Sequence, residues 1–225
     1  MIYRLESKKI NLDKMVPISS FKDGYIYNYS KLSKPTVLKY YSRNNNIPDE
    51  EQMRYFTKIR SIHILLPNKL LYANDKFSGY SLKAISKTGV FNKIITTPKD
   101  VIVDNLCIME DEIKELSKKN IVLRGMNHQD TIYNGELFIT NPDEYVIINN
   151  NNPDSSLKIE EINTFLFNGL LQEIISHEFN SERVNKSSVN KFIETLSQKD
   201  LYIKNSDFFD DIITEENVRE YVKRI

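Results

Sequence analysis

The organisation of the chain is decided by the stretch Ile121–Tyr145, IVLRGMNHQDTIYNGELFITNPDEY. At its centre, Asn134-Gly135 separates two short runs of β-branched and aromatic residues, 131–133 and 136–139. Asn-Gly between two such runs predicts a tight hairpin, because a type I′ turn needs positive φ at both of its central residues. Polar loops border the hairpin at both ends and place carboxylates and amides close together. We therefore expect the chemistry of the protein to lie at this hairpin.

The composition is that of a globular protein with a sizeable core. The chain has 225 residues, of which 40% are hydrophobic and 28% charged, and this length suits one large domain or two small lobes. Its 31 basic and 31 acidic residues cancel, so no net field favours nucleic acid. The single cysteine, Cys107, cannot form an internal disulfide and fits a core position.

No targeting segment or membrane span is predicted. The first ten residues lack the apolar run of a signal peptide, and no stretch approaches the ~18 apolar residues of a spanning helix. We therefore expect a cytoplasmic protein with neither a membrane partner nor a nucleic-acid partner. The bias toward Lys, Asn and Ile is typical of an AT-rich bacterial or phage genome.

Residues 1–86 are predicted to form a β-rich lobe with one helix. Residues 1–16 are polar and mixed, and are interpreted as a leading strand and loop. Aromatic and β-branched runs at 18–41 indicate two or three antiparallel strands, and a second hairpin is predicted at 70–85. Between them, Pro48 and the acids after it predict the start of a helix. The apolar side of this helix is predicted to consist of Tyr55, Phe56, Ile59, Ile62 and Ile64.

Residues 87–225 are predicted to form a mostly helical lobe that contains a β-hairpin near 131–139. Helical spacing of apolar residues or capping signals predict helices at 100–119, 157–179, 187–198 and 215–225. The fold class is therefore α+β, with two lobes linked near residues 83–92.

This order of elements resembles the protein-kinase fold, and especially small bacterial kinase-like proteins, over residues 18–169. In that family a strand-borne lysine binds phosphates and pairs with a glutamate on a helix. A catalytic loop supplies an aspartate base and, five residues later, a metal-binding asparagine. A short hairpin then leads to a second metal-binding aspartate. The resemblance implies a two-lobed fold with a β-rich N-terminal lobe and an abbreviated helical C-terminal lobe.

In the N-terminal lobe the resemblance points to cofactor-binding residues. Lys39, in an otherwise apolar strand, takes the position of the phosphate-binding lysine; the alternative is an edge-strand lysine that discourages aggregation. Gln52 stands where the family has its helix glutamate, and Glu51 is one residue off that face. A glutamine can hydrogen-bond to a lysine but forms no ion pair. Gly24 stands alone where the family has a glycine-rich phosphate loop, and a single glycine is most often a turn residue.

In the C-terminal lobe the Asn134-Gly135 turn serves as the anchor. Asp130 then takes the position of the metal-binding asparagine, and Gly125 stands where the base should be. Asn141 replaces the second metal aspartate, with Asp143 two residues later. Asp130 is thus the candidate catalytic residue, and the candidate metal ligands are Asp130, Asn141 and Asp143.

A competing register makes His128-Gln129-Asp130 the catalytic triplet and Asn149 the later metal position. It keeps a base, but it moves the hairpin turn to residues 141–143. We prefer the first register, because turn chemistry is a stronger local signal than a triplet. In both registers the second metal aspartate is an asparagine.

These substitutions bear on function because phosphoryl transfer needs Mg²⁺ held on carboxylates and a base that orients the attacking hydroxyl. General-base assistance contributes ~10²–10⁴-fold, and Gly125 supplies none. The resemblance therefore implies a pseudokinase that acts as a nucleotide- or partner-binding module, with ATP and Mg²⁺ as ligands or with no cofactor. The alternative is an active phosphotransferase in which Asp130 and Asp143 hold metal and Lys39 holds phosphate. A third possibility is an unrelated binding protein in which the order of elements is coincidental.

Overall fold

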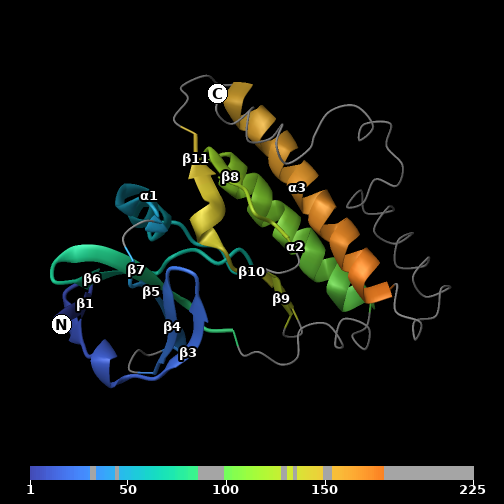
Figure 1. Ribbon diagram of the computed structural model, residues 1–225. Coiled ribbons are helices and arrows are strands. Elements are labelled where there is room, and N and C mark those ends of the chain that lie inside the picture. Colours follow the sequence, from blue (N-terminus) through green and yellow to red (C-terminus); the bar gives the residue numbers. More distant parts are fainter. Residues whose placement is uncertain are drawn as a thin grey trace. The chain divides into compact units, whose positions relative to one another are not determined.

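The chain forms two compact units, Met1–Ser86 and Lys87–Ile225. The computed structural model describes residues 1–30, 34–43, 46–85, 99–127, 131–133, 136–148 and 154–179 (Figure 1). These residues form an α+β protein with one large antiparallel sheet and three α-helices, and the described strands form no closed barrel. Among the described residues, no helix is both long enough and apolar enough to cross a membrane.

A seven-stranded antiparallel sheet forms most of the first unit. Its strands are β1 (Tyr3–Leu5), β2 (Lys8–Ile10), β3 (Pro17–Phe21), β4 (Gly24–Tyr29), β5 (Thr36–Tyr41), β6 (Lys69–Ala73) and β7 (Lys76–Lys83). Their order across the sheet is β2-β1-β6-β7-β5-β4-β3. The predicted strands at 18–41 and the hairpin at 70–85 are confirmed. β6 and β7 join through Asn74 and Asp75, whose φ angles of 49° and 63° are both positive, as a two-residue hairpin turn requires.

The first sixteen residues contribute more to this sheet than the predicted leading strand and loop. These residues form the two strands β1 and β2. β1 pairs with β2 on one side and with β6 on the other. The 3-10 helix η1 (Leu12–Lys14) follows. Glu6, in the turn between β1 and β2, has a φ of 54° although it is neither glycine nor asparagine. This turn therefore carried no recognisable sequence signal.

One hydrophobic cluster of the first unit lies on one face of the sheet. Tyr27 and Leu38 are directly opposed on β4 and β5, so their side chains share this face. The buried members of the cluster are Tyr3, Leu5, Leu12, Tyr27, Tyr29, Leu38, Leu71 and Ala73. Ile10, Met15 and Tyr40 pack against them.

The predicted helix after Pro48 is confirmed at its start and wrong at its end. It is α1 (Glu50–Phe56), and its N-cap residue Asp49 accepts a hydrogen bond from the Gln52 backbone N–H at 2.7 Å. Met53 and Phe56 are fully buried. α1 therefore buries a face that only partly matches the predicted one.

The apolar residues after α1 are not helical. Of the predicted apolar face, Tyr55 within α1 and Ile62 after it are exposed, whereas Ile64 is buried in a non-helical segment that runs to Pro67. The Ser61 hydroxyl accepts a hydrogen bond from the Ile64 backbone N–H at 3.2 Å, which replaces a helical partner. Apolar spacing alone did not reveal this break, since a continuous apolar run and a helical face share several positions.

The second unit combines two long helices with two small antiparallel sheets. The helices α2 (Lys99–Ser117) and α3 (Asp154–Phe179) pack side by side (Figure 1). The strands are β8 (Ile121–Leu123), β9 (Thr131–Tyr133), β10 (Leu137–Ile139) and β11 (Tyr145–Ile147), and the 3-10 helix η4 (Pro142–Glu144) precedes β11. β9 pairs with β10, and β8 pairs with β11. The helices predicted at 100–119 and 157–179 are confirmed; those predicted at 187–198 and 215–225 lie outside the described residues.

The central hairpin has the predicted strands but not the predicted turn length. Tyr133 pairs with Leu137, which leaves three residues, 134–136, between the paired positions. The two-residue connection predicted at Asn134-Gly135 is therefore wrong, and those two residues themselves lie outside the described residues. The competing register is also wrong in placing the hairpin turn at 141–143, because η4 there joins β10 to β11, two strands of different sheets.

Candidate functional site

Lys39 lies in the middle of the sheet rather than at its edge. β5 pairs with β4 on one side and with β7 on the other, and Lys39 stands opposite Ile26 and Tyr80. The interpretation of Lys39 as an edge-strand lysine is therefore wrong. Its half-buried side chain places the ammonium nitrogen 4.9 Å from the centroid of the Phe21 ring, 5.7 Å from that of Tyr41 and 6.0 Å from that of Tyr80. These aromatic faces stabilise the positive charge where water is partly excluded.

The helix α1 lies over the same face of the sheet as Lys39. Lys39 is opposite Tyr80, and Tyr80 is opposite Leu70 on β6, so the three side chains share a face. Tyr72 follows Leu70 by two residues and points the same way. The Tyr72 hydroxyl donates a hydrogen bond of 2.9 Å to the Glu50 carboxylate of α1. Lys39 and the helix that follows it in sequence are thus on one side of the sheet.

A small polar network fastens α1 to β6. Arg54 donates a hydrogen bond of 2.7 Å to the Tyr72 hydroxyl and another to Glu50. Burial raises the pKa of Tyr72, and the hydrogen bond to Glu50 raises it further. The hydrogen bond to Glu50 also raises the pKa of Arg54. Of the two residues predicted to replace the helix glutamate, Gln52 is half-buried and Glu51 is exposed.

Two glycines flank the β5 backbone beside Lys39, and their role is steric. A Cβ at Gly24 would lie 1.9 Å from the Tyr40 carbonyl oxygen and 3.0 Å from the Phe21 ring. A Cβ at Gly79 would lie 1.9 Å from the Lys39 carbonyl oxygen, and Gly79 has a φ of +147° at a β-bulge. Close approach of neighbouring strands is sufficient to require glycine at both positions. Gly24 therefore adds no independent support for a phosphate loop.

In the second unit, Gly125 stands where the kinase resemblance expects a base, and it lies beside η4. Gly125 has a φ of +72°, and a Cβ there would lie 2.7 Å from the Glu144 Cβ. The pairing of β8 with β11 explains this approach, because it brings the residues after Leu123 next to those before Tyr145. Asp143, half-buried, directly precedes Glu144 in η4. The loop that contains Gly125 and the acidic 3-10 helix are therefore neighbours.

The other predicted ligands are placed less completely. Asn141 precedes η4, and its side chain does not cap that helix. Its backbone carbonyl accepts a hydrogen bond from the Glu144 N–H at 3.4 Å. Asp130 lies outside the described residues. In the part of the chain that the structure describes, no group of three or more His, Cys, Asp or Glu side chains is arranged to hold a metal ion.

The segment after β8 is held by polar residues that no sequence motif marks. Asn127 donates from its side-chain amide to the Gly125 carbonyl at 3.1 Å, and the Thr131 hydroxyl donates to the Asn127 carbonyl at 2.8 Å. Asn163 of α3, fully buried, accepts a hydrogen bond of 2.8 Å from the Leu123 backbone N–H. No motif spacing marks these asparagines; only the folded pairing of β8 with its neighbours does.

The candidate residues fall into two groups. Lys39, Gln52, Glu51 and Gly24 belong to the first unit, whereas Asn141 and Asp143 belong to the second. Comparison with known proteins assigns no function to either group of residues. No protein-family model matches the chain, and no curated protein matches it. The functional argument therefore rests on the residues themselves.

Proposed function

We propose that the protein is a two-lobed, kinase-like pseudokinase, a nucleotide- or partner-binding module whose catalytic centre is incomplete. The observation that carries the proposal is the setting of Lys39. It lies on the third strand counted from β3, in a strand paired on both sides, and the next helix, α1, covers the same sheet face. Protein kinases likewise carry the phosphate-binding lysine on their third strand and pair it with the helix that follows.

Several residues at the expected catalytic positions support the proposal of binding without efficient turnover. Gly125, at the position of the base, has no side chain that can accept a proton. Asn141 offers a neutral amide where a carboxylate would attract Mg²⁺, which prefers anionic oxygen ligands. Gln52, at the position of the helix glutamate, likewise carries a neutral amide in place of a carboxylate. Each of these substitutions removes charge that phosphoryl transfer uses and leaves groups that still bind by hydrogen bonds.

One observation favours an active phosphotransferase as the second candidate. The carboxylates of Asp143 and Glu144 belong to η4, next to the loop that begins at Gly125. In that function Asp130 and Asp143 would hold Mg²⁺, and Lys39 would hold the nucleotide phosphates. The two candidates differ in whether metal strengthens nucleotide binding and whether phosphate is transferred.

Thermal unfolding of the full chain with ATP, with and without Mg²⁺, tests the proposal. We expect ATP to raise Tm, because a ligand that binds only the folded state stabilises it. Lys39→Met keeps the apolar stem over the aromatic rings but removes the charge, and should abolish the rise. Lys76→Met, at an exposed lysine of the same sheet, is the matched control and should leave the rise unchanged.

The same titration separates the candidates. A rise in Tm that requires Mg²⁺ and disappears in both Asp130→Asn and Asp143→Asn, together with ATP turnover, would establish the active enzyme and refute the pseudokinase. A metal-independent rise without turnover is the expected result. No rise at millimolar nucleotide would refute nucleotide binding and restrict the function to partner binding.

A further inference from the structure

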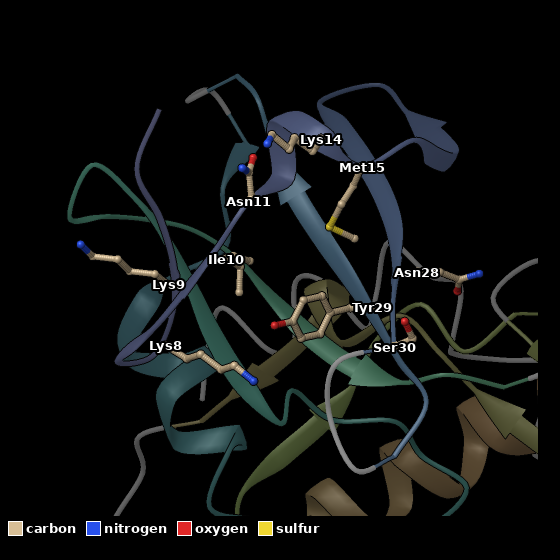
Figure 2. Close-up of a pocket in the computed structure, with 9 residues that line it drawn as sticks. All are labelled: Lys8, Lys9, Ile10, Asn11, Lys14, Met15, Asn28, Tyr29 and Ser30. Atoms are coloured by element: carbon tan, nitrogen blue, oxygen red, sulfur yellow. The ribbon is translucent and has the colours of Figure 1, made fainter.

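A pocket of about 800 Å³ opens in the first unit, lined by residues of β2, η1 and the end of β4 (Figure 2). Its apolar surface comes from Ile10, Met15 and the ring of Tyr29, all of which belong to or pack against the core cluster. The volume is within the range of sites that bind small molecules. An apolar wall with polar groups around it is also typical of such sites.

The charged side chains around this pocket are all positive. Lys8, Lys9 and Lys14 line it, and no Asp or Glu is among its described lining residues. Lys8 opposes Leu5 across the β1–β2 pair, so its side chain lies on the core face of the sheet. Figure 2 shows Lys8 and Lys14 on opposite sides of the Tyr29 ring, whereas Lys9 points away from it. Although the chain has no net charge, positively charged side chains thus gather at this pocket.

The Tyr29 hydroxyl is the group that points to a ligand. Tyr29 is only 4% exposed, yet its hydroxyl makes no hydrogen bond with any described residue. Its oxygen is directed into the pocket, toward the side where Lys8 and Ile10 lie (Figure 2). The Tyr29 oxygen is not among the fully buried side-chain atoms that lack a partner, so it faces the open space of the pocket. A ligand oxygen in the pocket can accept its hydrogen bond.

We propose that this pocket binds a small organic anion, a phosphate or carboxylate group carried on an apolar or aromatic body. The anionic group lies between Lys8 and Lys14 and accepts a hydrogen bond from the Tyr29 hydroxyl. The apolar body packs against Ile10 and Met15. Hydrogen bonds between charged and polar groups are stronger than neutral ones, so the tyrosine and the lysines reinforce each other.

This site is separate from the surface around Lys39. Lys39 stands opposite Ile26 of β4, so the two side chains share a face of the sheet. Tyr29 is three residues further along the same strand and therefore points to the opposite face. The pocket is thus an additional binding site, and its occupation does not depend on the proposed pseudokinase function.

Titration of the ¹⁵N-labelled full chain with phenyl phosphate, followed by ¹H–¹⁵N NMR, tests the proposal. We expect saturable shifts confined to the amides of residues 8–15 and 28–30. Benzoate tests the carboxylate source, inorganic phosphate tests the charge alone, and benzyl alcohol tests the aromatic body without charge. Phenyl phosphate or benzoate should bind at least tenfold more tightly than either inorganic phosphate or benzyl alcohol, since only the two aromatic anions use both parts of the site.

Matched variants then identify the groups. Tyr29→Phe keeps the ring and should weaken phenyl phosphate or benzoate binding about tenfold, the lower end for a hydrogen bond to a charged group. Lys8→Gln combined with Lys14→Gln should abolish it. Tyr27→Phe on the same strand and Lys58→Gln combined with Lys76→Gln serve as controls and should bind like the unaltered chain. Absence of saturable shifts with both aromatic anions, or equal losses in variants and controls, would overturn the proposal.

Discussion

At the scale of single residues, Asn163 of the second unit is fully buried and has several hydrogen-bond partners. Its side chain accepts from the Leu123 N–H and donates to the Ser117 hydroxyl and the Ile121 carbonyl, each at 2.8 Å. All of these groups are buried, and Asn163→Ala removes the side-chain partner of the Leu123 N–H and the Ile121 carbonyl, whereas the Ser117 hydroxyl keeps its hydrogen bond to the Ile113 carbonyl. We expect the free energy of unfolding to fall by about 3 kcal/mol, since each unsatisfied buried group costs roughly 1–3 kcal/mol.

Urea unfolding followed by the NMR peaks of β8 and α3 measures this loss. Thr164→Ala, at an exposed position of the same helix, is the control and should change the free energy by less than about 0.5 kcal/mol. If both variants changed it equally, the asparagine network would not contribute to stability.

The glycines offer a second residue-scale prediction, because their surroundings differ. Gly24→Ala and Gly79→Ala place a methyl group 1.9 Å from a backbone oxygen of β5, and Gly79 also has a φ that side chains rarely adopt. Each should lower the free energy of unfolding of the first unit by about 2 kcal/mol or more. Gly169→Ala meets nothing within 4 Å in α3 and should raise that of the second unit by about 0.5–1 kcal/mol.

The measurement is the urea midpoint of NMR peaks from each unit, which reports the two units separately. A stable Gly24→Ala variant would show that the strands near Tyr40 can move apart, and would contradict a steric need for glycine at that position. Loss of stability in Gly169→Ala would contradict the open space around that residue.

At the scale of elements, the capping of α1 is a testable link between sequence and fold. The Asp49 carboxylate accepts from the Gln52 N–H, and α1 has only seven residues, so a lost cap affects much of the helix. Asp49→Ala should lower the free energy of unfolding of the first unit by about 1 kcal/mol. Asp49→Asn keeps a capping oxygen without the charge and should remain within a few tenths of a kcal/mol.

The readout is again the urea midpoint, here of the peaks of α1 and β6. Equal losses in both variants would assign the effect to the negative charge near the helix start rather than to the hydrogen bond. No loss in Asp49→Ala would mean that the contacts of Met53, Phe56 and the Tyr72 network alone determine the helix.

Which elements the sequence predicted depends on the physical signal behind each. The β6–β7 hairpin was predictable because Asn74-Asp75 favours positive φ, and the long helices because their apolar residues recur at helical spacing. The β1–β2 hairpin was not predictable, since Glu6 adopts positive φ although glutamate is not a residue type that favours it. The anion pocket escaped prediction for the same reason: only this unmarked turn brings Lys8 beside Tyr29.

The candidate residues were likewise chosen on local patterns, and their role in a site stays a prediction. A lysine in an apolar strand and a polar crossing before a hairpin are local patterns, and they led to Lys39, Gly125 and Asn141. The steric need for glycine at 24 and 79 is not local, because it arises from the approach of neighbouring strands. Likewise, the position of Gly125 against Glu144 follows from the β8–β11 pairing, which joins residues more than twenty positions apart.

At the scale of the whole molecule, the division into two units predicts that the first can fold alone. Every strand pair among the described residues lies within one unit, and the sheet of the first unit and its core cluster are complete before residue 86. A fragment of residues 1–86 also exceeds the ~60 residues at which single domains become marginal.

We expect it to unfold cooperatively in urea and to keep the β1–β7 amide shifts of the full chain. A fragment of residues 1–73, which removes β7 from between β5 and β6, is the matched control and should not fold, because it splits the sheet at its centre. Collapse of the amide dispersion in the 1–86 fragment would show instead that the sheet depends on residues beyond 86, so that the two units fold as one.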